Sequence, residues 1–199
     1  SIRHLVSRGS PVLTLQTGLG NVETMAEIVD RSAILGGVTY LGATSLSGSR
    51  IHHAGIGPTL IGELDGSLTG RVKEVKKAFD VSGVQAEVSD NIVGHIWSKT
   101  LVYAAINPLT ALLRLKNGQL VQKMESIALA KRLIDEGRLV AQAYGVQLPQ
   151  VDPYDLFLDV CRNTEGGRPC PIASRPPGSV LSSPRVSSSR RRPSSRSGN

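Results

Sequence analysis

Hydrophobic and polar positions along this chain fall into two patterns. Before residue 90, short apolar runs such as Val12–Gln16 and Ala33–Tyr40 are separated by glycine-rich turns. Runs of this length between turn residues are typical of buried strands. After residue 90, apolar residues recur every three or four positions over long segments, which is typical of helices. The pattern predicts an α/β region followed by an all-α region.

The α/β region is expected to contain strands and helices in alternation. The strand at Val12–Gln16 leads into a turn, and Asn21 is expected to cap a helix over residues 22–29. A second strand covers Ala33–Tyr40. Residues 50–63, rich in glycine and histidine, are expected to form a hairpin or paired strands. The last elements are a helix over residues 71–82 with Val72, Val75, Ala78 and Phe79 on its inner face, its end at Gly83, and a strand over residues 84–88.

Three helices are expected in the all-α region. Asp90 or Asn91 caps the first, which is long and largely apolar. Asn117-Gly118 is expected to make a turn, and a second long helix then covers residues 119–144 and ends at Gly145. The third helix begins near Asp152-Pro153, with proline in its first turn.

The first of these helices carries a lysine within an apolar sequence. Lys99, Tyr103 and Asn107 are spaced i, i+4, i+8 and therefore share one face. A lysine in such surroundings can have a lowered pKa and act as a proton donor near neutral pH. The alternative is a rim lysine that buries its methylenes and keeps its ammonium in water. Asn107-Pro108 can likewise be explained without a functional role, because proline in a helix can simply mark a kink.

Four motifs occur in the order and spacing of a known family. They are LQTGLGN at 15–21, GGVTYLGA at 36–43, HHAGIGPTLIGE at 52–63, and WSK…INPLTA…NG over 97–118. On these motifs the chain resembles the ketopantoate reductases (2-dehydropantoate 2-reductases), over about residues 10–165. The resemblance implies a Rossmann-type nucleotide-binding domain and a helical domain. It also implies reduction of 2-dehydropantoate, or a similar 2-keto acid, to the 2-hydroxy acid with hydride from NADPH.

The resemblance assigns roles to individual residues of the helical region. Lys99 matches the family's proton-donating lysine. Asn107 and Asn117 match two asparagines that hold the hydroxyl and carboxylate of the substrate. Tyr103 stands where the family pattern has an asparagine, and it is assigned to substrate binding.

The resemblance also assigns a cofactor site in the α/β region. Thr17 replaces an asparagine that contacts cofactor and substrate in the family's QNG motif. Gly18 falls beside the nicotinamide, and Ala43 falls on a backbone position beside the cofactor. The family's phosphate-binding loop, G-x-G-x-x-G, is not found in this sequence. Gly55-Ile56-Gly57 lies in the wrong context for one, because no helix is expected after it to offer its amides to a phosphate.

The net positive charge of the chain comes entirely from its last residues. From residue 166 onward there are seven arginines and no acidic residue, and the other 16 basic residues equal the 16 acidic ones. The expected organisation is therefore a partial nucleotide-binding domain at 1–90, an incomplete helical substrate or dimerisation domain at 91–165, and a disordered Arg/Ser/Pro-rich tail at 166–199.

Two explanations of the tail remain open. The codons for Gly167-Arg168-Pro169-Cys170, read from the third base of the first codon, can encode Ser-Ser-Met. The family has this motif near that position, so out-of-frame translation after about Gly167 is one explanation. The other is a genuine disordered segment that binds nucleic acid through its arginines. The tail contains no aromatic residue for base stacking, and this disfavours specific RNA recognition.

The remaining composition narrows the class of protein. No apolar run approaches the length of a membrane span, and the two cysteines fit neither a disulfide framework nor a zinc motif, so no metal site is expected. These features favour a cytoplasmic protein. The family resemblance implies a small-molecule 2-keto acid as its substrate, and a homodimer is one candidate assembly. Two functions remain: a reductase of which this chain is an incomplete part, and a non-catalytic helical interaction or dimerisation module of the same fold.

Overall fold

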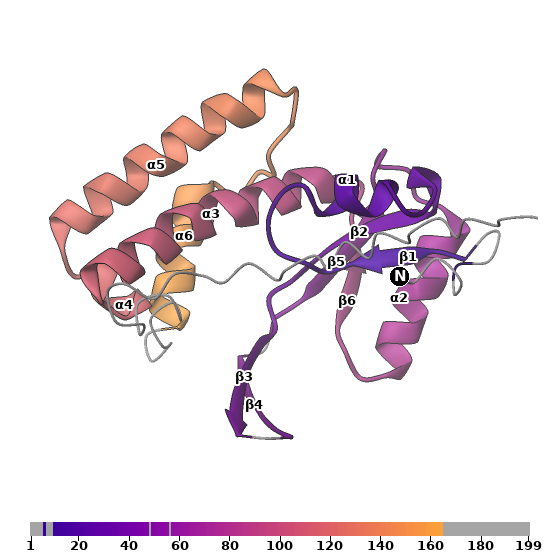
Figure 1. Cartoon of the computed structure of the whole chain (residues 1–199), viewed down its shortest axis with the longest axis horizontal. Helices are drawn as coiled ribbons and strands as arrows, with labels where there is room; N and C mark the ends of the chain where they lie inside the picture. Colours follow the sequence, from indigo (N-terminus) through magenta and orange to yellow (C-terminus); the bar gives the residue numbers. More distant parts are fainter. Residues whose placement is uncertain (1–5, 7–9, 48, 56, 165–199) are drawn as a thin grey trace, which may run out of the picture.

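The structure is a computed structural model that describes residues 6, 10–47, 49–55 and 57–164. A sheet with its helices forms one half, a helical bundle forms the other, and the long helix α3 joins them (Figure 1). This arrangement confirms the predicted α/β region followed by an α-helical region. The elements are β1 (Val12–Thr14), α1 (Asn21–Ala26), η2 (Arg31–Ala33), β2 (Ile34–Thr39), β3 (Gly42–Ser47), β4 (Arg50–Gly55), β5 (Thr59–Glu63), α2 (Gly70–Val81), β6 (Ala86–Val88), α3 (Ile92–Leu113), α4 (Asn117–Leu120), α5 (Met124–Ala143) and α6 (Pro153–Asn163).

The main sheet has the strand order β1-β2-β5-β6. β1 runs parallel to β2, β5 runs antiparallel to β2, and β6 runs parallel to β5. Residues 34–38 of the central strand β2 are all buried, as expected for a strand covered on both faces. Gly37 permits this close packing, because a Cβ there would lie 2.6 Å from Leu15 Cδ2. The sheet therefore fixes the end of β2, where Thr39 and Tyr40 lie.

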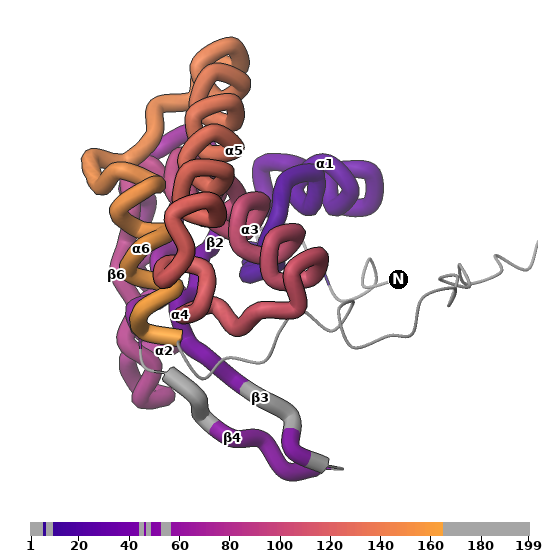
Figure 2. Tube along the Cα trace, turned by 90° about the vertical axis from the view of Figure 1, so that its left-hand side faces the viewer, coloured from indigo at the N-terminus to yellow at the C-terminus, as the bar shows by residue number. Residues whose placement is uncertain are grey.

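A second, two-stranded sheet extends away from the body of the protein. It consists of β3 and β4, which pair in antiparallel fashion and project from the main sheet in both views (Figures 1 and 2). Residues 50–63 do form two paired strands, as one of the two expectations had it, but the expected hairpin was wrong, because β4 and β5 pair with different partners. β5 is buried between β2 and β6, whereas Arg50, Ile51 and His52 of β4 are exposed. The more apolar strand of this segment joins the core sheet, and the other pairs with its predecessor.

Two helix starts differ in how they are capped. Asn91 caps α3 as predicted, since its side-chain oxygen accepts from Gly94 N at 3.1 Å. The predicted cap at Asn21 was wrong. Asn21 is the first residue of α1, and its amide donates back to Gly18 O at 3.0 Å, while Gly20 occupies the cap position with φ 86°. A left-handed residue is required there, and glycine adopts this conformation without strain.

Some expected features of the helices also need correction. Val72 of α2 is buried as predicted, but Ala78 is exposed and does not belong to the inner face. Asn117, where a turn was expected, is instead the first residue of the helix α4, and α5 begins only at Met124. The single helix expected over residues 119–144 is thus two. Gln119 accepts from the Lys116 backbone N–H at 2.8 Å, which starts a separate short helix.

The helical half packs around the C-terminal part of α3. Figure 1 shows α5 along one side of α3 and α6 crossing it, and α3 contacts both helices. Pro108 lies inside α3, yet the helix continues to Leu113. The buried core of this half consists of Val102, Ala105, Ile106, Leu109, Leu120, Ala130, Ile134, Phe157 and Cys161.

An ion pair between the buried Glu63 and the partly exposed Arg71 ties the end of β5 to the start of α2. The Glu63 carboxylate accepts from Arg71 through both oxygens, one at 2.7 Å from Nε, and also from the Thr69 hydroxyl. These hydrogen bonds, first of all those from Arg71, lower the pKa of Glu63. A carboxyl with a depressed folded pKa stabilises the fold above its unfolded pKa, and this stabilisation is lost as the pH falls through the folded pKa.

Removing the arginine of this pair is expected to destabilise the fold. Arg71→Met leaves the buried Glu63 carboxylate without its main partner, at a cost of about 2 kcal/mol in the free energy of unfolding at pH 7. The difference from wild type should shrink as the pH falls through the lowered pKa of Glu63, because the carboxylate is then protonated and no longer needs its partner. Urea unfolding at pH 7 and over a series of acidic pH values measures it. Lys76→Met is the control, because its ion pair with Asp80 is exposed. An equal loss in both variants would contradict this account.

Within the residues described, no helix is sufficiently long and apolar to cross a membrane. The same residues contain no cluster of three or more His, Cys, Asp or Glu side chains suited to a metal ion.

Candidate functional site

Lys99 lies where α3 passes the end of β2. The residue as a whole is only 8% exposed, and Nζ donates to the main-chain oxygen of Thr39 at 2.6 Å. The burial of this residue and the hydrogen bond from its ammonium to the sheet argue against the rim interpretation. Thr39 is held by the β2–β5 pairing, and its hydroxyl lies 2.9 Å from that of Thr59. The acceptor for Lys99 is thus built into the sheet.

Burial sets the electrostatics of Lys99. Desolvation lowers the pKa of its ammonium, because the charged form loses hydration on leaving water. Among the described residues, the ion pairs involve other cations, and no carboxylate is paired with Lys99. An ammonium in these surroundings releases its proton more easily than one in water.

Two tyrosines flank this ammonium. Nζ lies 5.5 Å from the centre of the Tyr40 ring and 5.6 Å from that of Tyr103. Burial raises the pKa of both phenols, so they stay neutral around pH 7. The structure thus places Tyr103 beside Lys99, as the shared helix face predicted. Tyr40 was missed as a site residue, although it lies in the GGVTYLGA motif directly after a strand.

A small cavity opens beside Lys99. Gln16, Thr17 and Gly18 from the turn that follows β1 line it, together with Gly37, Val38 and Ile96. Its volume is about 10 Å³, the space of roughly one water molecule. The structure therefore brings Thr17 and Gly18, both predicted site residues, to the same small space as Lys99. Gly18 has φ 107°, a conformation that favours glycine.

The predicted asparagines lie farther along the helical half. Asn107 is exposed on α3, one turn beyond Tyr103, and its main-chain oxygen accepts from the Thr110 hydroxyl at 3.0 Å. Asn117 begins α4, and its amide donates to Thr164 Oγ1 at 2.8 Å. Neither asparagine has a described hydrogen bond to Lys99. Their assignment to the substrate stays a prediction.

Ala43 lies in the projecting sheet. It belongs to β3, is exposed, and pairs with His53 of β4. It follows Tyr40 by three residues, so it lies close to the site along the chain. Gly57, which precedes β5, packs against Tyr40, and a Cβ at this position would lie 2.7 Å from Tyr40 Cβ. Gly55-Ile56-Gly57 is followed by strand β5 and by no helix, which agrees with the prediction that it is not a phosphate loop.

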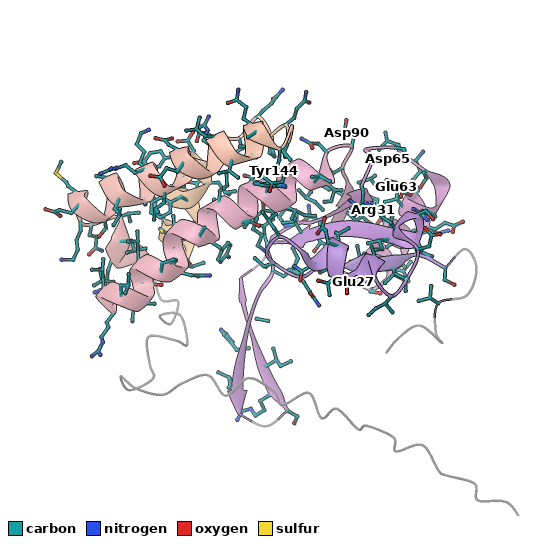
Figure 3. All side chains as sticks on the ribbon, turned by 45° about the horizontal axis from the view of Figure 1, so that its top comes forward. Glu27, Arg31, Glu63, Asp65, Asp90 and Tyr144 are labelled. Carbon is teal, nitrogen blue, oxygen red and sulfur yellow. The ribbon has the colours of Figure 1, made fainter. Side chains whose placement is uncertain are left out.

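A larger groove adjoins this small cavity. Its volume is about 760 Å³, and it shares Gln16, Gly18 and Ile96 with the small cavity at Lys99. Trp97 of α3 and Tyr144 at the end of α5 form one wall, with ring centres 5.7 Å apart. Figure 3 shows Tyr144 where the end of α5 lies over α3. The turn at residues 16–20 thus separates an apolar groove from a desolvated lysine.

This arrangement suits acid catalysis at a carbonyl. A buried ammonium can hydrogen-bond a ketone oxygen, stabilise the negative charge that develops there and donate a proton. Cys161 of α6 is not suited to nucleophilic chemistry, because burial raises the pKa of its thiol to about 12. Lys99 is therefore the group in this region best suited to react.

Two family profiles match this chain. The one described as "Ketopantoate reductase PanE/ApbA" matches residues 1–66, and the one described as "Ketopantoate reductase PanE/ApbA C terminal" matches residues 91–174. Among curated proteins, the 2-dehydropantoate 2-reductase of Archaeoglobus fulgidus is 38% identical over 136 residues, which are 68% of this chain and 46% of that protein. The Pyrococcus horikoshii enzyme of the same name is 34% identical over 159 residues, 80% of this chain and 52% of that protein.

Solved structures agree with these matches. The 2-dehydropantoate 2-reductase of Geobacter metallireducens has a TM-score of 0.74 at 29% identity, covering 86% of this chain and 57% of that chain. A PanE/ApbA family ketopantoate reductase from Ralstonia eutropha JMP134 has a TM-score of 0.72 at 25% identity, covering 84% and 54%. A complex of D-mandelate dehydrogenase with NADH shares the fold, with a TM-score of 0.71 at 22% identity. The chain spans about half the length of the curated relatives it matches.

Proposed function

The chain belongs to the ketopantoate reductase family, and we propose that it carries the proton-donating half of an NADPH-dependent reductase of 2-dehydropantoate or a similar 2-keto acid. The observation that carries this proposal is the buried Lys99 ammonium, held by the Thr39 carbonyl without a paired carboxylate in the described part of the chain. The curated relatives bear the name of this reaction.

The proposed reaction places Lys99 at the ketone oxygen. As the carbonyl carbon accepts a hydride, its oxygen gains negative charge, which the ammonium stabilises and then neutralises by giving up a proton. The proton leaves Nζ, and the product is the 2-hydroxy acid. The lowered pKa of Lys99 favours this transfer, because an ammonium with a lower pKa is a stronger acid.

The other predicted residues are proposed to position substrate and cofactor. Tyr103, beside the ammonium, would contact the substrate near the reacting carbonyl. Asn107 and Asn117 would bind its hydroxyl and carboxylate, for which amides offer both donors and acceptors. This role requires the Asn117 amide to leave its partner Thr164, an exposed and therefore weak hydrogen bond.

NADPH supplies the hydride when it is bound. Thr17 and Gly18, which line the cavity at Lys99, are proposed to hold its nicotinamide end, and Ala43 to lie beside it. Gly18 suits this role because its backbone is open: a Cβ there would meet only Asn21 Nδ2, at 3.9 Å. The preference for NADPH over NADH is part of the proposal.

A chimera tests the proposed function. The 136 residues of this chain that match the Archaeoglobus fulgidus 2-dehydropantoate 2-reductase replace the corresponding stretch of that enzyme, which supplies the rest of the chimera. We expect the chimera to oxidise NADPH, followed at 340 nm, only when 2-dehydropantoate or another 2-keto acid is added. A folded chimera that oxidises NADPH with none of these acids would contradict the proposal and favour a non-catalytic role for the helical half.

Four further expectations stay predictions. A cytoplasmic location agrees with Cys161, which is free and buried. A homodimer would be detected by sedimentation of the purified chain at several concentrations. The tail and the proposed change of reading frame lie outside the described residues, as does the boundary at residue 166. The division of the rest into domains at residue 90 likewise stays a prediction.

A further inference from the structure

The Lys99 ammonium has an unusual set of neighbours. It has three hydrogen-bond donors, and one of them is used by Thr39 O at 2.6 Å. The rings of Tyr40 and Tyr103 also lie beside it, with their centres 5.5 and 5.6 Å from Nζ. A buried ammonium is normally paired with a carboxylate, since desolvation of an unpaired charge is costly. In the part of the chain that the structure describes, aromatic rings take this place.

Tyr40 is held firmly in position by the turn into β5. Its main-chain N–H donates to Pro58 O at 3.0 Å, directly after the β2–β5 ladder. Gly57 packs against it so closely that a Cβ at Gly57 would lie 2.7 Å from both Cβ and O of Tyr40. The backbone that carries the Tyr40 ring therefore cannot shift without disturbing this turn.

Tyr103 is fixed from the helical half. It lies one turn after Lys99 on α3 and packs against the buried core that contains Phe157 and Cys161. The two rings thus come from different halves of the fold and meet at one ammonium. Tyr40 and Tyr103 are the titratable groups that face Lys99 among the described residues, and Cys161 stands behind Tyr103.

We propose that Tyr40 and Tyr103 are positioning residues whose ring faces hold the Lys99 ammonium in its charged form, in place of a carboxylate. An aromatic face attracts a cation through its quadrupole but accepts no proton. A carboxylate would also hydrogen-bond the ammonium's protons and raise its pKa further than the rings do, making it a poorer acid. The rings stabilise the charge and leave the donors free for a carbonyl oxygen. The use of the ammonium in catalysis rests on the proposed function, but its retention by the rings does not.

The Lys99 pKa in the purified chain tests this directly. Lysine labelled with ¹³C at Cε is followed by NMR from pH 6 to 11, and the Lys99 signal is assigned by its absence in Lys99→Arg. Tyr40→Leu removes the ring face but fills similar space, so the pKa should fall by about half a unit to one unit. Tyr40→Phe keeps the face and should stay near wild type. Tyr103→Leu and Tyr103→Phe should repeat this contrast.

A fluorinated series keeps the test valid if the leucine variants unfold. Phenylalanine, monofluorophenylalanine and trifluorophenylalanine at position 40 have nearly the same shape and progressively weaker ring quadrupoles. The Lys99 pKa should fall stepwise along this series. A constant pKa across the series, or an equal fall in Tyr40→Phe and Tyr40→Leu, would overturn the proposal. The titration needs neither substrate nor NADPH. An inactive chimera together with a stepwise fall of the Lys99 pKa along the series would therefore refute the proposed function alone.

Discussion

Lys99→Met is expected to lower kcat of the chimeric reductase by about 10²–10⁴-fold, the usual contribution of a general acid. Methionine has nearly the length of the lysine stem and no charge, so it fills the same buried space. The loss should appear in kcat, because the ammonium acts on charge that develops as the hydride arrives. Steady-state NADPH oxidation at saturating 2-keto acid measures it.

The control for this variant is an exposed lysine in the same chain. Lys73→Met removes a positive charge from α2, away from the Thr39–Tyr40 site. Its kcat should stay within about twofold of the parent, since exposed charges act weakly at a distance. A Lys99→Met enzyme that keeps more than a tenth of the parental kcat would show that Lys99 is not the proton donor.

Phe157→Ala is expected to have the largest effect on stability. Phe157 of α6 is fully buried in the core of the helical half, and its ring stacks on Tyr154 at 6.1 Å between centres. Truncation to alanine removes most of this contact and leaves a cavity, which costs about 3–5 kcal/mol in the free energy of unfolding. Urea unfolding of the purified chain, followed by circular dichroism, measures the loss.

Leu139→Ala provides the matched comparison for this core variant. Leu139 lies on α5 and is 67% exposed, so its truncation should change stability by less than about 0.5 kcal/mol. Equal effects of the two variants would contradict the packing of α6 against α3. The same packing places Cys161 and Thr164 near Tyr103 and Asn117, so loss of α6 would also disturb the site.

Local patterns predicted much of the fold. The buried run at β2, the Asn91 cap, the glycine at the end of α2 and the proline start of α6 all follow from rules that involve only neighbouring residues. The pairing of β4 with β3 did not follow, because residues 50–63 alone contain two adjacent strand patterns. Which strand enters the core sheet depends on the burial of β5 between β2 and β6, a long-range effect.

The site was predictable only along one helix. The spacing of Lys99 and Tyr103 placed them on one face, and the structure confirms their proximity. Tyr40 directly follows strand β2, 59 residues before Lys99, and periodicity gives no information about contacts between elements. The same limit applies to the Thr39 carbonyl, since a main-chain acceptor has no sequence signature. Thr17 and Gly18 were predicted as site residues from the family motif alone, and the structure places both in the lining of the small cavity at Lys99.

The pH dependence of kcat/KM in the chimera tests the central claim most directly, because it reports ionisations in the free enzyme. The acidic form of Lys99 is the active one, so kcat/KM should fall as the pH rises through the Lys99 pKa. Burial lowers this pKa, so the fall should be centred below pH 10.5, before Tyr40 and Tyr103 ionise. The falling limb should disappear from the residual activity of Lys99→Met. An unchanged limb in Lys99→Met, or a profile that stays level to pH 10.5, would contradict Lys99 as the proton donor.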